Sequence, residues 1–256
     1  MPENNLQLLI DAALAAGEIA KQHFQADPEV WDKGGDLGPV TEADLAVNRM
    51  LHHDLLHARP DYGWLSEETE DTSARLHSPC TFIIDPIDGT RAFIAGEKHF
   101  AHSLAIAENG RITSAVVHLP MKGLTYSATR GGGAFLNGQA IAPSHQPDVQ
   151  KANVLVTRAT MKSPLWRGVV PDFTRSFRPS LAYRMCLAAE GKYDAMLTLR
   201  DTWEWDVAAG DLIAQEAGAI VTTRENLPAR YNNPKPMLAG MVAAGAALHP
   251  QLIARL

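Results

Sequence analysis

The sequence predicts an α/β fold, because segments with helical periodicity alternate with short apolar segments of the kind that form strands. Three observations support this class. Leu6, Ile10 and Ala13 begin a run of apolar residues spaced by three and four, which indicates an amphipathic helix. Short apolar runs separated by turn residues occupy 102–140, which indicates antiparallel strands. Strand and helix patterns then alternate over 153–256, as in layered α/β proteins.

The first part of the chain is expected to supply helices and one buried strand. We expect a helix over residues 6–24, a loop rich in Asp, Gly and Pro over 27–40, and a second helix over 41–57. Residues 80–84 form an apolar strand that ends in a turn, and 90–95 follow as a short helix.

Three antiparallel strands are expected next, over 103–107, 112–118 and 125–129. Glu108-Asn-Gly110 is a tight hairpin signal, because Asn and Gly readily adopt positive φ. Asn137-Gly138 marks another turn of the same kind.

The second half is expected to alternate strands with helices. In chain order these are a strand over 153–157, a helix over 180–190, a strand over 194–199, a helix from Trp205 to Gly218, a strand over 219–223 and a closing helix over 249–256. At 256 residues the chain can bury a substantial core, as one large domain or two joined halves.

The segment Asp85-Pro-Ile-Asp88-Gly-Thr90 has the composition of a metal and phosphate site. Hard divalent cations such as Mg²⁺ prefer carboxylate and carbonyl oxygens. Pro86 and Gly89 would shape a turn that holds Asp85 and Asp88 towards one point. The first turn of the following helix would offer free N–H groups to an anion. An ordinary strand end is the alternative, since Asp, Pro and Gly are common in turns.

Two further turns contain carboxylates, Ser66-Glu67-Glu68 and Trp205-Asp206-Val-Ala-Ala-Gly210. With these three motifs in this order, the chain resembles the inositol monophosphatase-like phosphatases, which depend on Mg²⁺ and are typically sensitive to Li⁺. Pro39-Val-Thr-Glu-Ala-Asp44 and Gly131-Gly-Gly-Ala-Phe-Leu-Asn-Gly138 also fit that family.

The resemblance implies a five-layer αβαβα sandwich with its site at the junction of two halves. Residues 1–150 would form an N-terminal α+β half with the first metal motifs, and 151–256 a C-terminal α/β half with the third. The two halves are expected to form one compact unit.

The resemblance also implies which residues bind two Mg²⁺ ions, and it allows a third ion to bind. One ion would be held by Glu67, Asp85 and the backbone carbonyl of Ile87, and the other by Asp85, Asp88 and Asp206. Glu67 and Glu68 are consecutive, so we expect them to face different ways, and the family has its ligand at the first. Asp206 could instead cap its helix.

The resemblance also implies that Asp44 and Thr90 orient and deprotonate the attacking water. It implies that Asp88, Gly89 and Thr90 contact the substrate, and that the N–H groups of Gly89 and Thr90 bind its phosphate. From the residues alone, Asp44 could simply form a capping box with Thr41, because it stands three positions later.

The substrate is less strongly indicated. Leu199 stands where inositol phosphatases commonly have a glutamate, and Gly89-Thr-Arg91-Ala-Phe-Ile94 is similar to the bisphosphate 3′-nucleotidases. We therefore favour hydrolysis of adenosine 3′,5′-bisphosphate to AMP and phosphate, with Arg200 as a residue for the second phosphate or as a surface arginine. The segment Arg130 to Gly138 instead resembles inositol and histidinol phosphatases, which are the alternatives. A regulatory metal-binding protein without turnover ranks lower.

Composition limits the kinds of partner that the protein is expected to bind. A formal net charge of −6 and the lack of a basic block argue against binding a nucleic-acid polymer. The sequence shows neither a membrane-length apolar run nor a signal pattern, so we expect a cytoplasmic protein. The expected partner is a small phosphate ester. A homodimer is a possible assembly that the sequence does not decide. Cys80 and Cys186 are expected to be buried free thiols.

Overall fold

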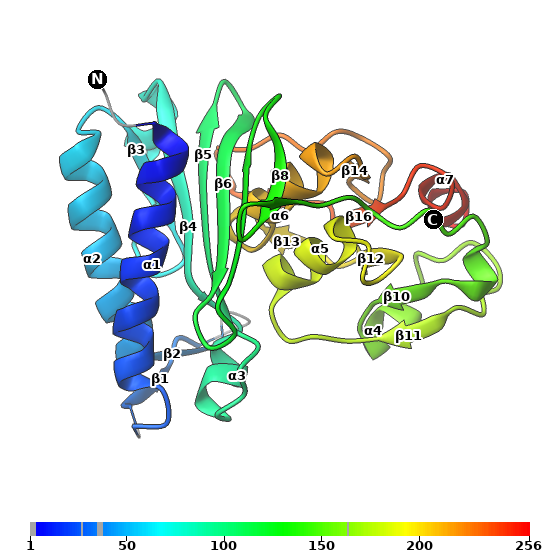
Figure 1. Cartoon of the computed structure of the whole chain (residues 1–256), viewed down its shortest axis with the longest axis horizontal. Coiled ribbons are helices and arrows are strands. Elements are labelled where there is room, and N and C mark those ends of the chain that lie inside the picture. Colours follow the sequence, from blue (N-terminus) through cyan, green and yellow to red (C-terminus); the bar gives the residue numbers. More distant parts are fainter. Residues whose placement is uncertain (1–3, 27, 35–37, 163) are drawn as a thin grey trace.

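The computed structural model describes residues 4–26, 28–34, 38–162 and 164–256. Residues 1–3, where no targeting signal is expected, lie outside the described residues. Figure 1 shows five layers, which from left to right are a helix pair, a large sheet, a second helix pair, a smaller sheet and an outer helical layer. The α/β class and the αβαβα order are therefore confirmed. The division at residue 150 stays a prediction, although the large sheet ends before it and the smaller one begins after it.

The first layer consists of α1 (Asn5–His23) and α2 (Glu42–Ala58), which confirm the two predicted helices. Their inner faces bury Leu9, Leu51 and Leu55 against the large sheet. These apolar positions follow the spacing of three and four that the sequence shows.

The connection between α1 and α2 contains a short ladder instead of the expected loop over 27–40. β1 (Val30–Asp32) and β2 (Pro39–Thr41) pair antiparallel. The side chains of β1 are exposed throughout, so the strand lacks the alternation of apolar and polar residues that identifies strands. Residues 27 and 35–37 of this connection lie outside the described part.

The second layer is a seven-stranded sheet with the order β3-β4-β5-β6-β7-β8-β9. β3 runs parallel to β4, and the other neighbours pair antiparallel. The strands are β3 (Gly63–Ser66), β4 (Cys80–Asp88), β5 (Ala101–Glu108), β6 (Arg111–Leu119), β7 (Leu124–Thr129), β8 (Gly133–Leu136) and β9 (Gln139–Ala140). Short helices η1 (Ser73–His77) and α3 (Thr90–Ile94) flank β4.

The predicted Asn-Gly turns are confirmed. Asn109 and Gly110 adopt positive φ between β5 and β6, and Asn137 and Gly138 do so between β8 and β9. The sequence does not predict β3, because its four residues are too few to show a recognisable alternation.

The third layer consists of α5 (Leu181–Ala189) and α6 (Glu204–Glu216), which lie between the two sheets (Figure 1). Close contact between them depends on Gly210, since a Cβ there would lie 2.6 Å from the Cβ of Met185. Gly210 of the third motif therefore lets α6 approach α5 closely.

The fourth layer is a five-stranded sheet with the order β11-β10-β12-β16-β14. Its strands are β10 (Asn153–Leu155), β11 (Thr174–Ser176), β12 (Ala195–Thr198), β14 (Ile220–Thr222) and β16 (Met241–Ala244). The remaining elements are η2 (Val149–Lys151), α4 (Arg158–Met161), α7 (His249–Ile253) and the ladder of β13 (Thr202–Trp203) with β15 (Met237–Leu238). The sequence does not predict the central strand β16, which is buried throughout and shows no alternation.

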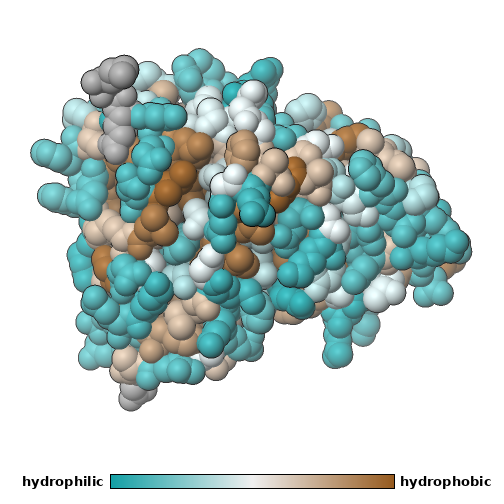
Figure 2. Space-filling view, viewed as in Figure 1, coloured by the Kyte–Doolittle hydropathy of each residue, from teal (hydrophilic) through white to brown (hydrophobic). Residues whose placement is uncertain are grey.

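The surface drawn in Figure 2 is mostly hydrophilic, with apolar side chains gathered over the first helical layer and the adjoining sheet. Within the described residues, no helix is long and apolar enough to cross a membrane. Cys186 is a buried free thiol as predicted, whereas the free thiol of Cys80 is only half-buried.

Candidate metal and phosphate site

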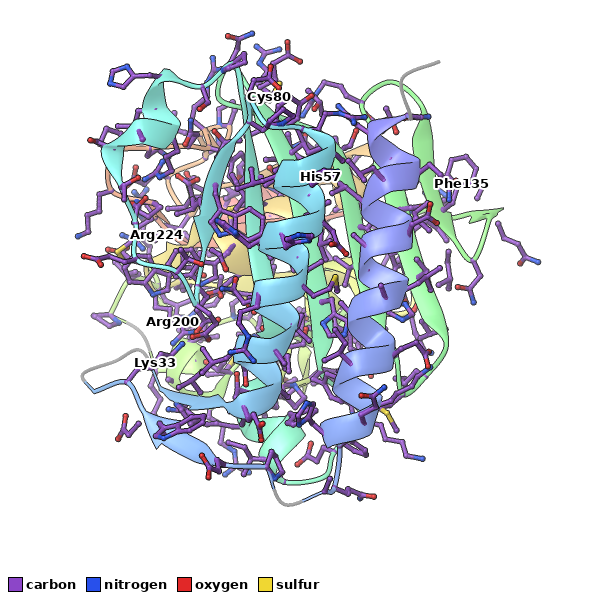
Figure 3. The ribbon with its side chains drawn as sticks, turned by 90° about the vertical axis from the view of Figure 1, so that its left-hand side faces the viewer. Lys33, His57, Cys80, Phe135, Arg200 and Arg224 are labelled. Carbon is purple, nitrogen blue, oxygen red and sulfur yellow. The ribbon has the colours of Figure 1, made fainter. Side chains whose placement is uncertain are left out.

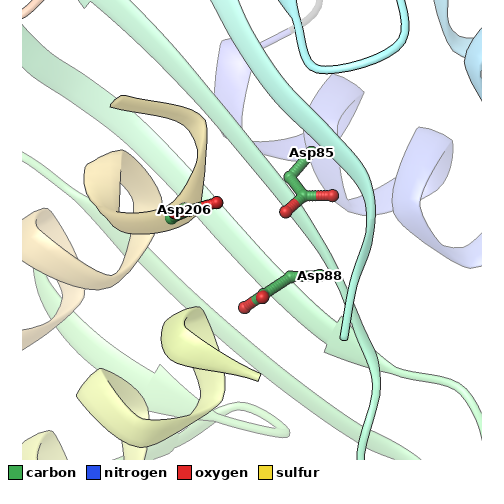
Figure 4. A group of neighbouring side chains, drawn as sticks. All are labelled: Asp85, Asp88 and Asp206. Atoms are coloured by element: carbon green, nitrogen blue, oxygen red, sulfur yellow. The ribbon is translucent and has the colours of Figure 1, made fainter. Parts of the chain in front are cut away.

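Three predicted aspartates from two layers meet at one point. Oxygens of Asp85 and Asp88 on β4 and of Asp206 on α6 all lie within 4.8 Å of one another (Figure 4). Residues three apart on a regular strand face opposite sides, but the pairing of β4 with β5 is irregular between Asp85 and Asp88. This irregularity, at the Asp-Pro-Ile-Asp turn, lets both carboxylates face α6.

The cluster is electrostatically unfavourable without a cation. Burial, followed by the charges of Glu67, Asp88 and Asp206, raises the pKa of Asp85 well above its ordinary value. Burial and the charges of Asp88 and Glu67 raise the pKa of Asp206 to about 8. Among the described residues, Oδ1 of Asp85 is buried and has no hydrogen-bond partner. Buried carboxylates with an unpartnered oxygen fit a hard divalent cation such as Mg²⁺.

The N-terminus of α5 holds Asp88 from the other half of the chain. The Ser180 hydroxyl and the Ala182 backbone N–H each donate to Oδ2 of Asp88 at 2.6 Å. Ser180 also caps α5 by accepting from the N–H of Tyr183. Our sequence analysis missed Ser180 as a site residue; its only signal is its position as the first residue of a predicted helix.

The carboxylates of Glu67 and Glu68 converge on one lysine, whereas the sequence argument expected them to face different ways. Lys33 donates from Nζ to both carboxylates, at 2.7 Å for Glu67 and 2.9 Å for Glu68. The alternation rule does not apply, because β3 ends at Ser66 and the two glutamates lie in the turn that follows. Glu68 is the more buried side chain, at 3% against 16% exposed. The sequence analysis did not identify Lys33.

Asp44 forms the capping box that the sequence allows and also lies beside Thr90. Oδ2 of Asp44 accepts from the backbone N–H and the hydroxyl of Thr41, so the capping box is present. The Thr90 hydroxyl lies 3.2 Å from the other oxygen of Asp44, and 3.1 Å from the carbonyl of Ile87. Burial raises the pKa of Asp44 to about 6. Asp44 and Thr90 are therefore neighbours, as the joint role requires.

Gly89 allows the chain to turn from β4 into α3. Its φ of +102° lies in the left-handed region, which favours glycine. α3 begins at Thr90, and the Gly89 carbonyl accepts from the N–H groups of Ala92 at 2.8 Å and Phe93 at 3.1 Å. Asp206 is the third residue of α6 and accepts from the Thr202 hydroxyl at 3.0 Å instead of capping the helix with its side chain.

A cavity of about 1130 Å³ opens beside the cluster. Its walls include all predicted site residues except Asp44, namely Glu67, Asp85, Ile87, Asp88, Gly89, Thr90, Arg200 and Asp206. Asp44 lies behind Thr90, to which it is hydrogen-bonded.

Arg200 lies in a loop, because β12 ends at Thr198, one residue before the end of the predicted strand. Arg224 anchors this loop by donating to the carbonyl of Leu199 at 2.9 Å and to Asp201 at 2.6 Å. Figure 3 shows Arg200 near the same end of the molecule as Lys33. The Leu199 side chain is buried in the outer core.

The raised pKa values predict how Mg²⁺ affects stability. A carboxyl group whose pKa is raised by folding binds more protons in the folded state than in the unfolded state. Without Mg²⁺, such a group therefore lowers the free energy of unfolding as pH rises from about 4 towards 8. Mg²⁺ bound between the carboxylates removes this loss. We therefore expect the increase in Tm that Mg²⁺ produces to grow between pH 5 and pH 8. Thermal unfolding with and without Mg²⁺ across this range checks the prediction, which a constant or falling increase would contradict.

Comparison with known proteins supports one family. A model of the inositol monophosphatase family matches residues 1–256. An inositol-1-monophosphatase of Rhizobium meliloti is 31% identical over 253 residues, covering 94% of this chain and 91% of that protein. The Nus factor SuhB of Escherichia coli is 31% identical over 252 residues, covering 94% and 90%. A solved IMPase structure from Thermotoga maritima has a TM-score of 0.86 and 27% identity, covering 98% of this chain and 96% of that one.

Proposed function

Because the chain belongs to the inositol monophosphatase family, we propose that it is a Mg²⁺-dependent phosphomonoesterase that hydrolyses a small phosphate ester. The observation that supports this most directly is the cluster of the buried Asp85 and Asp88 with the half-buried Asp206, in which one Asp85 oxygen has no partner among the described residues. These residues, together with Glu67 and the Ile87 carbonyl, would hold two Mg²⁺ ions. The ions would neutralise phosphate charge and lower the pKa of a water. A titration with Mg²⁺ that measures the number of bound ions tests whether a third ion binds.

Asp44 and Thr90 are proposed to position the attacking water and accept its proton. The Thr90 hydroxyl already donates towards Oδ1 of Asp44, so its own oxygen can accept from a water in the cavity. The proton would move through the hydroxyl to Oδ1 of Asp44. A base with a pKa of about 6 suits proton transfer near neutral pH.

Phosphate binding is proposed for the backbone N–H groups of Gly89 and Thr90. They lie where β4 turns into α3, and both residues line the cavity. Backbone donors held in place before the reaction stabilise developing negative charge without reorganisation.

The substrate remains a choice between two esters. The Rhizobium meliloti relative is named an inositol-1-monophosphatase, so inositol 1-phosphate is the first compound to test, and the relatives named above give the nucleotidase no support. Adenosine 3′,5′-bisphosphate stays the second candidate, because Arg200 lines the cavity while Leu199 is buried away from it. Phosphate release from both esters and histidinol phosphate, with Mg²⁺ and with chelator, tests the proposal. Li⁺ is expected to inhibit the release.

Arg200→Ala separates the two candidates. If the substrate has two phosphates, we expect KM for adenosine 3′,5′-bisphosphate to rise by roughly tenfold or more, because a guanidinium–phosphate bond is charge-assisted. KM for inositol 1-phosphate should change by less than about twofold. Steady-state kinetics of the variant with both esters measures this. Equal effects on both, or a wild-type preference for inositol 1-phosphate, would favour the inositol phosphatase.

A regulatory role without turnover is the remaining alternative, since one relative is named as a Nus factor. Absence of phosphate release from every ester in the panel, by folded protein that still binds Mg²⁺, would support it.

A further inference from the structure

Two aromatic side chains line the cavity beside the acidic cluster, and neither has a role in the proposed chemistry. Phe177 is 44% exposed and Trp203 is half-buried, and both belong to the C-terminal half of the chain. Pro179 and Met237 also line the cavity. At about 1130 Å³ the cavity has room for much more than a phosphate group.

Each ring stands directly before a helix that contributes to the cluster. Phe177 precedes by three positions Ser180, whose hydroxyl binds Asp88 at the start of α5. Trp203 precedes Asp206 by three positions at the start of α6. The two aromatic residues therefore precede the two helix N-termini that contribute to the cluster, and they line the same cavity as Gly89 and Thr90.

Both rings are supported on one side by a partner within the protein. The guanidinium of the buried Arg184 lies 5.3 Å from the centre of the Phe177 ring. The Trp203 ring stacks on that of Trp205, with centroids 4.8 Å apart and planes at 9°. A ring with one face covered and an edge or face in a cavity is a platform for a further planar group.

The backbone of both residues is held in place. Arg178 donates to the carbonyl of Phe177 at 2.6 Å and to the Tyr193 hydroxyl at 2.7 Å. Trp203 pairs with Met237 in the β13–β15 ladder. Rings that are fixed before binding lose little conformational entropy when a ligand stacks on them.

We propose that Phe177 and Trp203 form a ring-binding subsite, so that the preferred substrate is a phosphate monoester whose alcohol contains a planar aromatic ring. This inference rests on the proposed phosphatase function. An aromatic ring stacks on such platforms, whereas a puckered polyol ring instead needs hydrogen-bonding partners for its hydroxyl groups.

Phosphate esters and phosphonates that carry a benzyl or a cyclohexylmethyl group test the subsite, because the two groups differ in the planarity of the ring. Both phosphate esters release a primary alcohol on hydrolysis. We would measure binding of benzylphosphonate and cyclohexylmethylphosphonate by calorimetry with Mg²⁺, and hydrolysis of the two phosphate esters. Wild type is expected to bind the benzyl compound roughly tenfold more tightly, and to show the same preference in KM with similar kcat.

Phe177→Leu and Trp203→Leu keep an apolar side chain but remove the rings, and each should reduce the preference by about two- to tenfold. Phe135→Leu is the matched control, since Phe135 is a half-buried aromatic residue of β8 that Figure 3 shows on the opposite side from Arg200. This control should keep the full preference. Phe177→Leu alters a largely exposed side chain, so it reports on the subsite even if Trp203→Leu disturbs packing on Trp205.

Equal affinity of wild type for the two phosphonates, or a preference that survives in both variants, would overturn the subsite. Calorimetry needs no turnover, so a failure of the proposed phosphatase activity is a separate result, seen as no hydrolysis of any ester. If the subsite holds, comparison of 2′-AMP with histidinol phosphate shows whether it prefers a nucleobase or an imidazole.

Discussion

Asp85→Asn is expected to abolish Mg²⁺-dependent phosphate release while the fold is retained. An oxygen of Asp85 lies within 4.8 Å of oxygens of Asp88 and Asp206, and one of its oxygens is buried without a partner among the described residues. Its charge would be shared by two ions, so an amide there weakens both sites. A loss of about a thousandfold or more in kcat/KM is expected, since removing a single donor to a developing charge already costs about 10²–10³.

The same substitution should raise Tm slightly in the absence of Mg²⁺, because it removes one of several carboxylates that repel one another. Asp211→Asn is the matched control: this buried aspartate lies further along α6 and accepts from Tyr231 and Gln215 instead of facing the cluster. The control should lower Tm and keep Mg²⁺-dependent turnover. Full turnover by Asp85→Asn would refute the proposed metal site.

Thr90→Ala is expected to reduce kcat by about a hundredfold or more and to leave the Mg²⁺ concentration for half-maximal activity nearly unchanged. The hydroxyl contacts Asp44 and the Ile87 carbonyl, so it holds the base in place relative to the water. Thr90→Ser keeps the hydroxyl and should recover most of the rate.

Steady-state kinetics over a Mg²⁺ titration measures both quantities for Thr90→Ala. A large shift in the Mg²⁺ dependence with an almost normal kcat at saturation would show that Thr90 acts through the metal site. The proton-relay role proposed for it would then be wrong.

The sequence alone predicts those parts of the fold and site that depend on near neighbours. Helical periodicity identifies α1 and α2, and the Asn109-Gly110 pair identifies its hairpin, because the physical causes lie within a few residues along the chain. The Asp85 to Thr90 segment is likewise local, since its proline and register shift lie at the end of β4 and its glycine directly before α3. Resemblance of the motifs to a phosphatase family supplied the remaining site residues.

Short elements were not predictable in the same way. β3 and β16 lack an alternating pattern, and β1 is exposed on both faces, so nothing local distinguishes them from loops. Their strand conformation depends on ladders to partners elsewhere, such as β4 for β3 and β12 for β16.

By itself, the sequence determined the layered class, the main helices and hairpins, and the carboxylates available for a metal. Only the tertiary structure decided which groups meet: Lys33 with Glu67 and Glu68, and Ser180 with Asp88, 92 positions away in the chain. Periodicity and turn chemistry act over a few residues. Contacts over such separations depend instead on how whole layers pack, and here the close approach of α6 to α5 at Gly210 helps to bring the two halves of the site together.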